Sequence, residues 1–276
     1  MNYAQFDKFV NDAIKNFSSK HYDLLRSISR TIILLVDSLA SLLSSVNVYV
    51  FVLVFIALMY YISRKVIKSV VLGLLLLGIY FIGYWQLMLV TLSMVIMSIC
   101  VAMLLGIPIG ILMSESSLVT SIVTPVLDFM QTIPSFVYLI PSVMLFGLGK
   151  ASALFAMIIY SLPSIIRLTA LGLRLVDKDA VEATKTYGAT RWQLLVMTKI
   201  PLALQSIFLG INQTSVASLS MVVTAAMIGA GGLGGEILRS INQINLGQGI
   251  RSGMCIVILA IVINNLNHEI SRKFNY

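Results

Sequence analysis

The fold is decided by one polar stretch, residues 177–201, which reads DKDAVEATKTYGATRWQLLVMTKIP. It carries seven of the chain's 19 basic and 11 acidic residues, and it lies between two apolar blocks that are each long enough to cross a bilayer. Asp177 is a suitable helix N-cap, and acidic residues, including Glu182, follow it where the helix dipole favours them. Gly188 permits a left-handed turn, and Pro201 is expected to stop the next helical run. We expect a helix, a sharp glycine turn and a second short helix, held in water at one face of a membrane.

Composition places the chain among membrane proteins. Of its 276 residues 58% are hydrophobic and 11% are charged, and the mean hydropathy is +0.96, whereas a soluble domain carries about 25% charged residues. The apolar runs are continuous and lack the alternation of an outer-membrane barrel. The net charge of +8 is explained by basic residues in cytoplasmic loops rather than by nucleic-acid binding. The expected fold class is therefore all-α, a polytopic helical membrane protein.

An amphipathic helix is predicted at residues 22–46, because apolar residues recur there every three or four positions. Asp37, near its middle, makes membrane spanning costly by roughly 2.5–3.5 kcal/mol. We expect this helix to lie along the membrane surface. The alternative is that it packs against the helical bundle or a partner subunit.

Seven membrane spans are predicted, with a further helix at 118–130 along the membrane interface. Four prolines, Pro108, Pro134, Pro141 and Pro163, are expected to break helices at membrane depth, which is tolerated where a broken helix packs internally or lines a cavity. The predicted spans cover residues 46–62, 69–85, 87–113, 133–147, 151–168, 202–228 and 252–266.

Basic residues predict the orientation. With residues 177–201 in the cytoplasm, the inside segments hold eleven basic residues, the outside loops three and the N-terminal tail five. The positive-inside rule then places the N-terminus outside and the C-terminus inside. The expected organisation is an extracytoplasmic tail with the amphipathic helix (1–45), two peripheral transmembrane helices (46–86), a core domain (87–266) and a cytoplasmic tail (267–276).

The glycine-rich stretch 229–234, GAGGLG, fits G-x-G-x-x-G. A dinucleotide site needs a preceding strand, whereas an apolar helix precedes this stretch. Its glycines instead predict sharp turns or close helix contacts in an outside loop that runs to Arg251. The sequence contains no P-loop pattern and no combination of nucleophile, base and orienting residue, so the chain is not predicted to be an enzyme.

The polar stretch resembles the EAA loop of ABC-importer permeases, whose pattern is E-A-A, three residues, G, nine residues, then I-x-L-P. Glu, the first Ala, Gly and Pro stand at the required spacing, while Thr184, Thr198 and Ile200 replace the second Ala, the Ile and the Leu. In that family the loop is a short coupling helix that docks on a separate cytoplasmic ATPase. The resemblance implies that the coupling residues are Glu182, Ala183, Thr184, Tyr187, Gly188 and Pro201.

Five further strings resemble one branch of that family, the permeases of glycine betaine/proline betaine importers. The resemblance implies a type I importer permease fold at the bacterial cytoplasmic membrane. It also implies that the complete importer consists of two permease copies, in the simplest case a homodimer, two ATPases and an external binding protein. It implies that the substrate is glycine betaine, proline betaine, carnitine or choline, and that the transport serves osmoprotection. ATP and Mg would be bound by the partner ATPase, with no cofactor and no metal in this chain, and the aromatic cage for the quaternary ammonium would lie on the binding protein. The strings are residues 128–149, 162–173, 212–214, 219–223 and 229–234.

Candidate residues for the translocation path are Asn212, Ser220 and Met221, all in the predicted span 202–228. The competing interpretation of Asn212 is that it forms hydrogen bonds between helices, because polar residues inside spans often do so. Two other functions stay open. A permease for another small solute, such as an amino acid, would share the coupling loop, and a secondary transporter would carry its own ion site and typically internal repeats.

Overall fold

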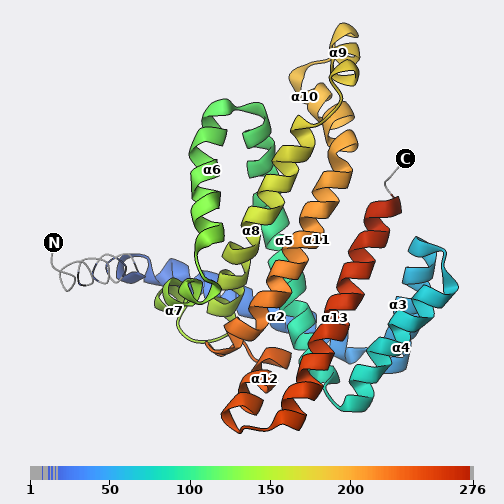
Figure 1. Cartoon of the computed structure of the whole chain (residues 1–276). Coiled ribbons are helices and arrows are strands. Elements are labelled where there is room, and N and C mark those ends of the chain that lie inside the picture. The colour runs from blue at the N-terminus through green and yellow to red at the C-terminus, as the bar shows by residue number, and fades with distance from the viewer. Residues whose placement is uncertain (1–7, 9–11, 13, 15, 17, 274–276) are drawn as a thin grey trace.

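The computed structural model describes residues 8, 12, 14, 16 and 18–273. Helices α5, α8 and α11 run side by side along the long axis, with α6 beside them on one flank and α13 on the other (Figure 1). Helices α3 and α4 form a hairpin beyond α13, α2 lies across the bundle, and α9 and α12 lie at opposite ends. The elements are α2 (Tyr22–Ser45), α3 (Val48–Ser63), α4 (Val66–Ile82), α5 (Trp85–Glu115), α6 (Ser117–Thr132), the 3-10 turn η1 (Ser135–Tyr138), α7 (Leu139–Phe146), α8 (Lys150–Arg174), α9 (Lys178–Thr186), α10 (Arg191–Gln193), the π-helix η2 (Leu194–Lys199), α11 (Ile200–Ala226), α12 (Gly232–Asn242) and α13 (Leu246–Lys273).

Small residues let α8 approach both of its neighbours closely. A Cβ atom added to Gly110 of α5 would lie 2.8 Å from the carbonyl oxygen of Ile166 in α8. One added to Gly172 of α8 would lie 2.4 Å from the Cβ of Ser206 in α11. In lipid, where apolar burial gives little drive for helix association, such close backbone packing is a main source of stability. The three helices α5, α8 and α11 thus form the tightly packed centre of the protein.

The segment 118–147 differs from the sequence-based prediction. Instead of an interfacial helix followed by one span at 133–147, α6 runs alongside α5 and α8, and the chain then bends by 109° into η1 and the eight-residue α7. Pro134 lies at the bend, where it cannot donate a backbone hydrogen bond and holds Ile133 in an extended conformation. Because eight residues rise only about 12 Å, residues 133–147 do not form a span on their own. The two helices together match one broken span or a re-entrant loop.

The other three prolines do not break their helices, so that prediction was wrong for them. Pro108 and Pro163 lie inside α5 and α8, which continue through them, and Pro163 is buried. Pro141 is in the first turn of α7, where a missing N–H breaks no helical hydrogen bond. Packing on neighbouring helices holds α5 and α8 together through their prolines, and this packing is not visible in the local sequence.

Helix α2 packs across the bundle, which was the alternative raised by its sequence. Val36 is fully buried, and Asp37 pairs with Lys150 of α8 at 2.5 Å. The pairing explains how a carboxylate is accommodated in the middle of this amphipathic helix. By length and hydropathy alone α2 would qualify as a span, but it lies across the other helices rather than along them (Figure 1).

The number of spans depends on how short helices are counted. Five of the described helices are long and apolar enough to cross a membrane, or six with the bent pair α6–α7, where seven spans were predicted. Two predicted spans are the helices α3 and α4, which have 16 and 17 residues. At about 1.5 Å per residue they reach about 24–26 Å, slightly less than the hydrocarbon thickness of about 30 Å.

The glycine-rich stretch forms turns and a close helix contact, as predicted. Gly229, Gly231 and Gly232 have φ angles of 91°, 76° and 63°. The amide N–H of Leu233 donates to Oγ1 of Thr91 at 2.9 Å, and a Cβ on Gly232 would lie 2.5 Å from the same oxygen. The predicted loop up to Arg251 is wrong, however, because it contains helix α12 and the first turn of α13. Polar residues in this amphipathic segment hid its helical period.

Candidate coupling loop and transport path

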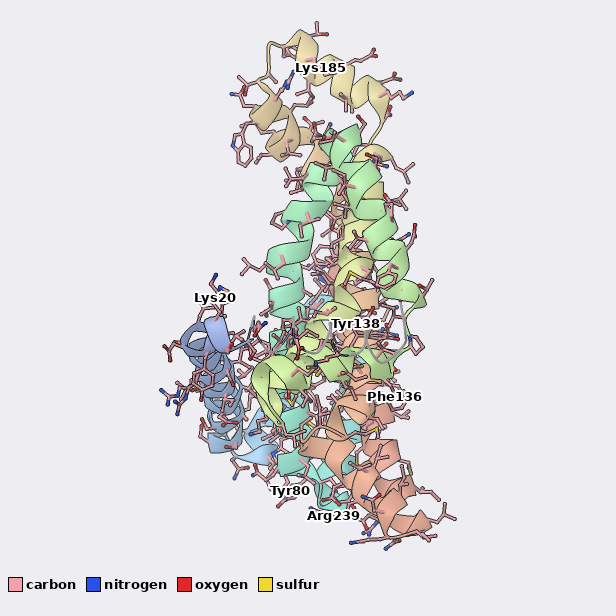
Figure 2. The ribbon with its side chains drawn as sticks, turned by 90° about the vertical axis from the view of Figure 1, so that its left-hand side faces the viewer. Lys20, Tyr80, Phe136, Tyr138, Lys185 and Arg239 are labelled. Atoms are coloured by element: carbon pink, nitrogen blue, oxygen red, sulfur yellow. The ribbon has the colours of Figure 1, made fainter. Side chains whose placement is uncertain are left out.

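Helix α9 projects from one end of the protein with none of its residues buried (Figure 1). Its N-cap is Asp177, whose Oδ1 accepts a hydrogen bond from the amide of Asp179 at 2.9 Å, as the sequence predicted. Figure 2 places Lys185, in the last turn of α9, at the opposite end of the molecule from Arg239 of α12. Glu182 and Ala183 are both exposed on this helix. A short helix that none of the described residues buries is suited to docking on another protein.

The turn after α9 depends on Gly188. Its φ is 81°, and its amide donates to the carbonyl of Lys185 at 2.9 Å. Among the described residues, and apart from its two chain neighbours, no atom lies within 4 Å of the place where a Cβ would stand. Backbone conformation, and not lack of space, therefore restricts this position. The preceding Tyr187 is 93% exposed, so its ring is also available to a partner.

The second half of the loop joins α11 without a break. A capping box between Thr190 and Gln193 starts α10, which continues through the π-helix η2 into α11 as one helical run, Arg191–Ala226. Pro201 lies in the first turn of α11 and does not stop the run. The prediction that Pro201 ends a helix is wrong, although its place at the start of a membrane helix is as expected. The wider turn of η2 directly before Pro201 changes the local hydrogen-bond spacing, which makes room for a residue without an N–H.

Two departures from the EAA pattern meet in space. Thr184 of α9 and Thr198 of η2 have their hydroxyl oxygens 3.0 Å apart, and Thr184 also donates to the carbonyl of Ala180. In the pattern these positions are Ala and Ile, an apolar pair. Here the two side chains are both polar and can share a hydrogen bond. Two threonines at these two positions were a sequence signal that the side chains could be in contact.

Both ends of the loop are fastened to the turn between α5 and α6. At the start, Arg174 donates to the carbonyl of Met113 at 2.6 Å and to Oγ1 of Thr120. At the end, Lys199 forms an ion pair with Glu115 at 2.5 Å. We call these three contacts the loop clasp. Sequence reasoning missed it because no spacing rule connects residues 54 to 84 positions apart.

The three candidate path residues lie on α11 but do not come together. Asn212 lines a hollow of about 670 Å³ between α11 and α13, and its buried Oδ1 has no hydrogen-bond partner within the described residues. Ser220 is exposed and donates to the carbonyl of Val216, whereas Met221 is fully buried in the apolar core. Sequence reasoning overlooked Asn267, which lines the same hollow and donates to Ser215 of α11 at 2.8 Å.

The fold and the exposed loop define a class of protein, a membrane-embedded permease with the type I importer fold. The family of binding-protein-dependent transport system inner membrane components matches residues 102–267. The chain therefore belongs to this family, and it is a multi-pass membrane component of a transport system.

Several curated relatives are permease subunits. The chain is 41% identical over 222 residues to the glycine betaine transport system permease protein of Bacillus subtilis, covering 80% of this chain and 78% of the relative. It is 38% identical to the glycine betaine/carnitine transport permease protein of Listeria monocytogenes, covering 87% and 86%. It is 43% identical to the glycine betaine/proline betaine transport system permease protein of Escherichia coli, covering 71% and 56%.

Among solved structures, the fold is similar to that of an inward-facing MetNI methionine ABC transporter. The TM-score is 0.63 at 20% identity, and the match covers 67% of this chain and 93% of that one. At this identity the similarity concerns the fold alone.

Proposed function

We propose that this chain is the permease subunit of an ATP-driven importer for glycine betaine or a related compatible solute such as proline betaine, carnitine or choline. The observation that carries the proposal is the 38–43% identity to permeases of such systems over 71–87% of the chain. The exposed helix α9 with Gly188 behind it supports the importer mechanism independently. Osmoprotection is the physiological role that such solutes imply.

The relatives' solutes share one chemical feature. Glycine betaine, proline betaine and carnitine each carry a fully substituted, positively charged nitrogen and a carboxylate. Another relative, 34% identical, is a trimethylamine N-oxide permease, whose solute also has a fully substituted nitrogen. Aromatic rings bind such cations by cation–π attraction. We assign this recognition to the external binding protein, and we assign passage to the permease.

Energy would come from a cytoplasmic ATPase that binds ATP and Mg, with no cofactor held by this chain. We propose that Glu182, Ala183, Thr184 and Tyr187 form its docking surface, and that Gly188 fixes the direction in which α9 leaves the bundle. ATP-driven closure of two ATPases would move two copies of α9, and a permease pair, most simply a homodimer, would then open outward. The loop clasp would pass this movement to α5 and α6.

The proposed orientation puts α9 in the cytoplasm. The α3–α4 turn and the end of α13 point toward the same end as α9 (Figure 1), and both are rich in basic residues. The positive-inside rule supports this arrangement, with the N-terminus outside and the C-terminus inside. We retain the division into an outer tail (1–45), two peripheral helices (46–86), a core (87–266) and an inner tail (267–276), although residues 1–17 lie mostly outside the described part.

Asn212, Ser220 and Met221 remain proposed path residues, with different requirements. Asn212 already faces a hollow, so a solute or water could reach it directly. Met221 is fully buried, so it would reach a path only after α11 shifts against its neighbours. An importer for another small solute, such as an amino acid, is the alternative that the same experiment addresses.

The test is uptake of labelled glycine betaine by transporter-deficient cells that express this chain with its ATPase and binding protein. We expect uptake that requires the ATPase and is lost in a Glu182→Ala/Gly188→Asp variant that still inserts into the membrane. An assembled complex that hydrolyses ATP without moving betaine would transfer the proposal to another solute. Failure to assemble with any ATPase, or normal uptake by the variant, would refute the coupling role.

A further inference from the structure

A pocket rich in basic residues lies where α3, α4 and α13 meet, at the same end of the molecule as α9. Its volume is about 220 Å³, and it lies between α13 and the α3–α4 hairpin, which forms the outer flank of the molecule beyond α13 (Figure 1). We call it the basic pocket. It is lined by Ile62, Ser63, Arg64, Lys65, Glu269, Arg272 and Lys273.

Charges in and beside the basic pocket are unbalanced. Its single lining acid, Glu269, is 4% exposed and already bound by Lys68 at 2.6 Å. Arg64, Lys65 and Arg272 form no ion pair with any of the described residues. Several cations therefore converge on one small cavity that holds a single carboxylate, that of Glu269. Such an arrangement is favourable when an anion occupies the cavity.

An apolar surface borders the basic pocket. A second hollow of about 510 Å³ is lined by Lys65, Val66, Ile67 and Lys68, so that Lys65 belongs to both hollows. Ile67 is 82% exposed, and Tyr61 is 71% exposed with the Nζ of Lys273 4.3 Å from its ring centre. An anion that fits both hollows must join a charged head to an apolar body.

We propose that the basic pocket binds the phosphate headgroup of an anionic phospholipid, whose acyl chains lie against Val66 and Ile67. The pocket lies at helix ends on the outer flank, where lipid headgroups meet a membrane protein. Arginine can bind two phosphate oxygens at once, which suits Arg64 and Arg272 to this role. Basic pockets between transmembrane helices are a known type of headgroup site. A freely soluble phosphate would leave the apolar hollow unused.

The experiment uses the purified complex in nanodiscs that contain a photoactivatable phosphatidylglycerol or a photoactivatable phosphatidylcholine of equal chain length. After illumination, crosslinks are mapped by peptide mass spectrometry. We expect phosphatidylglycerol to label peptides covering 61–68 and 269–273 at least tenfold more than phosphatidylcholine does. Equal labelling by the two lipids would overturn the proposal.

Two matched double variants sharpen the result. Lys65→Gln/Arg272→Gln removes two pocket charges and leaves the Lys68–Glu269 pair intact, and we expect about tenfold less labelling. Arg30→Gln/Arg251→Gln removes the same amount of positive charge away from the basic pocket, because neither residue lines it. This control should label as wild type does.

Three outcomes contradict the proposal. Pocket variants that label normally would exclude the pocket as the site, and control variants that lose labelling equally would reduce the effect to net charge. Loss of labelling in millimolar inorganic phosphate would indicate a site for a soluble anion. A thermal melt of each variant separates lost binding from lost folding. None of these readouts depends on which solute the permease carries.

Discussion

The packed centre of the bundle and the coupling loop follow opposite rules. In the centre, glycines of α5 and α8 stand where a single added carbon would lie within 3 Å of a neighbouring helix. In the loop, α9 has no buried residue, and Gly188 has empty space around it. Both regions use glycine, but the first uses its small size and the second its backbone freedom. Substitutions of glycine in the packed centre should therefore lower the amount of folded protein. Substitutions in the coupling loop should instead lower coupled transport.

The largest effect is expected at the centre. In Gly110→Val, the added Cβ would press on the carbonyl oxygen of Ile166 at 2.8 Å, and backbone atoms cannot move aside cheaply. We expect a destabilisation of about 3 kcal/mol or more and little folded protein in the membrane. Detergent-solubilised yield and the melting temperature measure this. Gly78→Val is the matched control, because a Cβ there would meet no atom of the described residues within 4 Å outside the backbone of its own helix. A similar loss in that variant would contradict the packing argument.

The next effect separates conformation from space. Gly188→Val should cost about 1–2 kcal/mol of local backbone strain at φ 81°. Because nothing clashes, the amount of folded permease should stay normal, while uptake falls about tenfold. Gly188→Asn should retain most of the uptake, since asparagine tolerates left-handed backbone. Equal uptake by the Val and Asn variants would show that positive φ is not what the loop requires.

A smaller effect tests the loop clasp, which joins the two regions. Glu115→Lys and Lys199→Glu each replace an ion pair by a repulsion, and partly exposed pairs contribute up to about 1 kcal/mol. We expect each variant to lower the solute moved per ATP hydrolysed about fivefold. The double variant, with the charges exchanged, should recover most of the coupling. If the double variant is as impaired as the two singles combined, the pair does not act through mutual attraction.

The smallest effect concerns the two threonines. Thr184→Ala or Thr198→Ile alone breaks a hydroxyl contact of 3.0 Å, and we expect uptake to fall by about twofold at most. The double variant restores the apolar pair of the EAA pattern and should transport as well as wild type. Reconstituted uptake assays resolve this difference. A double variant that is worse than either single would mean that the hydroxyls have a partner beyond each other.

The sequence predicted what depends on composition and local spacing. Continuous apolar runs gave α5, α8, α11 and α13, and the polar stretch gave α9 with its Asp177 cap and the turn at Gly188. The missed features depend on distant contacts. The helices continue through Pro108 and Pro163 because neighbouring helices pack against them. The local sequence does not distinguish these two prolines from Pro134, where the chain bends. Asp37 is tolerated because of Lys150, which follows 113 positions later.

For the candidate site, the same limit applies. Glu182, Ala183 and Gly188 could be proposed from sequence because their spacing resembles that of the EAA loop. Arg174 and Glu115 could not, because a charged residue at the end of an apolar run is ordinary in a membrane protein. Their pairing with Thr120 and Lys199 is a property of the folded chain. Whether Asn212, Ser220 and Met221 act together depends on movements of α11 that the sequence does not encode locally.

The π-helix η2 sets the rotation of the exposed helix α9 relative to the membrane helix α11. A π turn holds about one residue more than an α turn, and each residue of an α-helix corresponds to a rotation of about 100°. The six residues 194–199 therefore set the rotational phase of α9 relative to α11. Adding or removing one residue there would turn the exposed face of α9 away from any protein docked on it, even if every side chain of α9 were unchanged. The length of that short segment should therefore matter for coupling as much as the identity of Gly188 does.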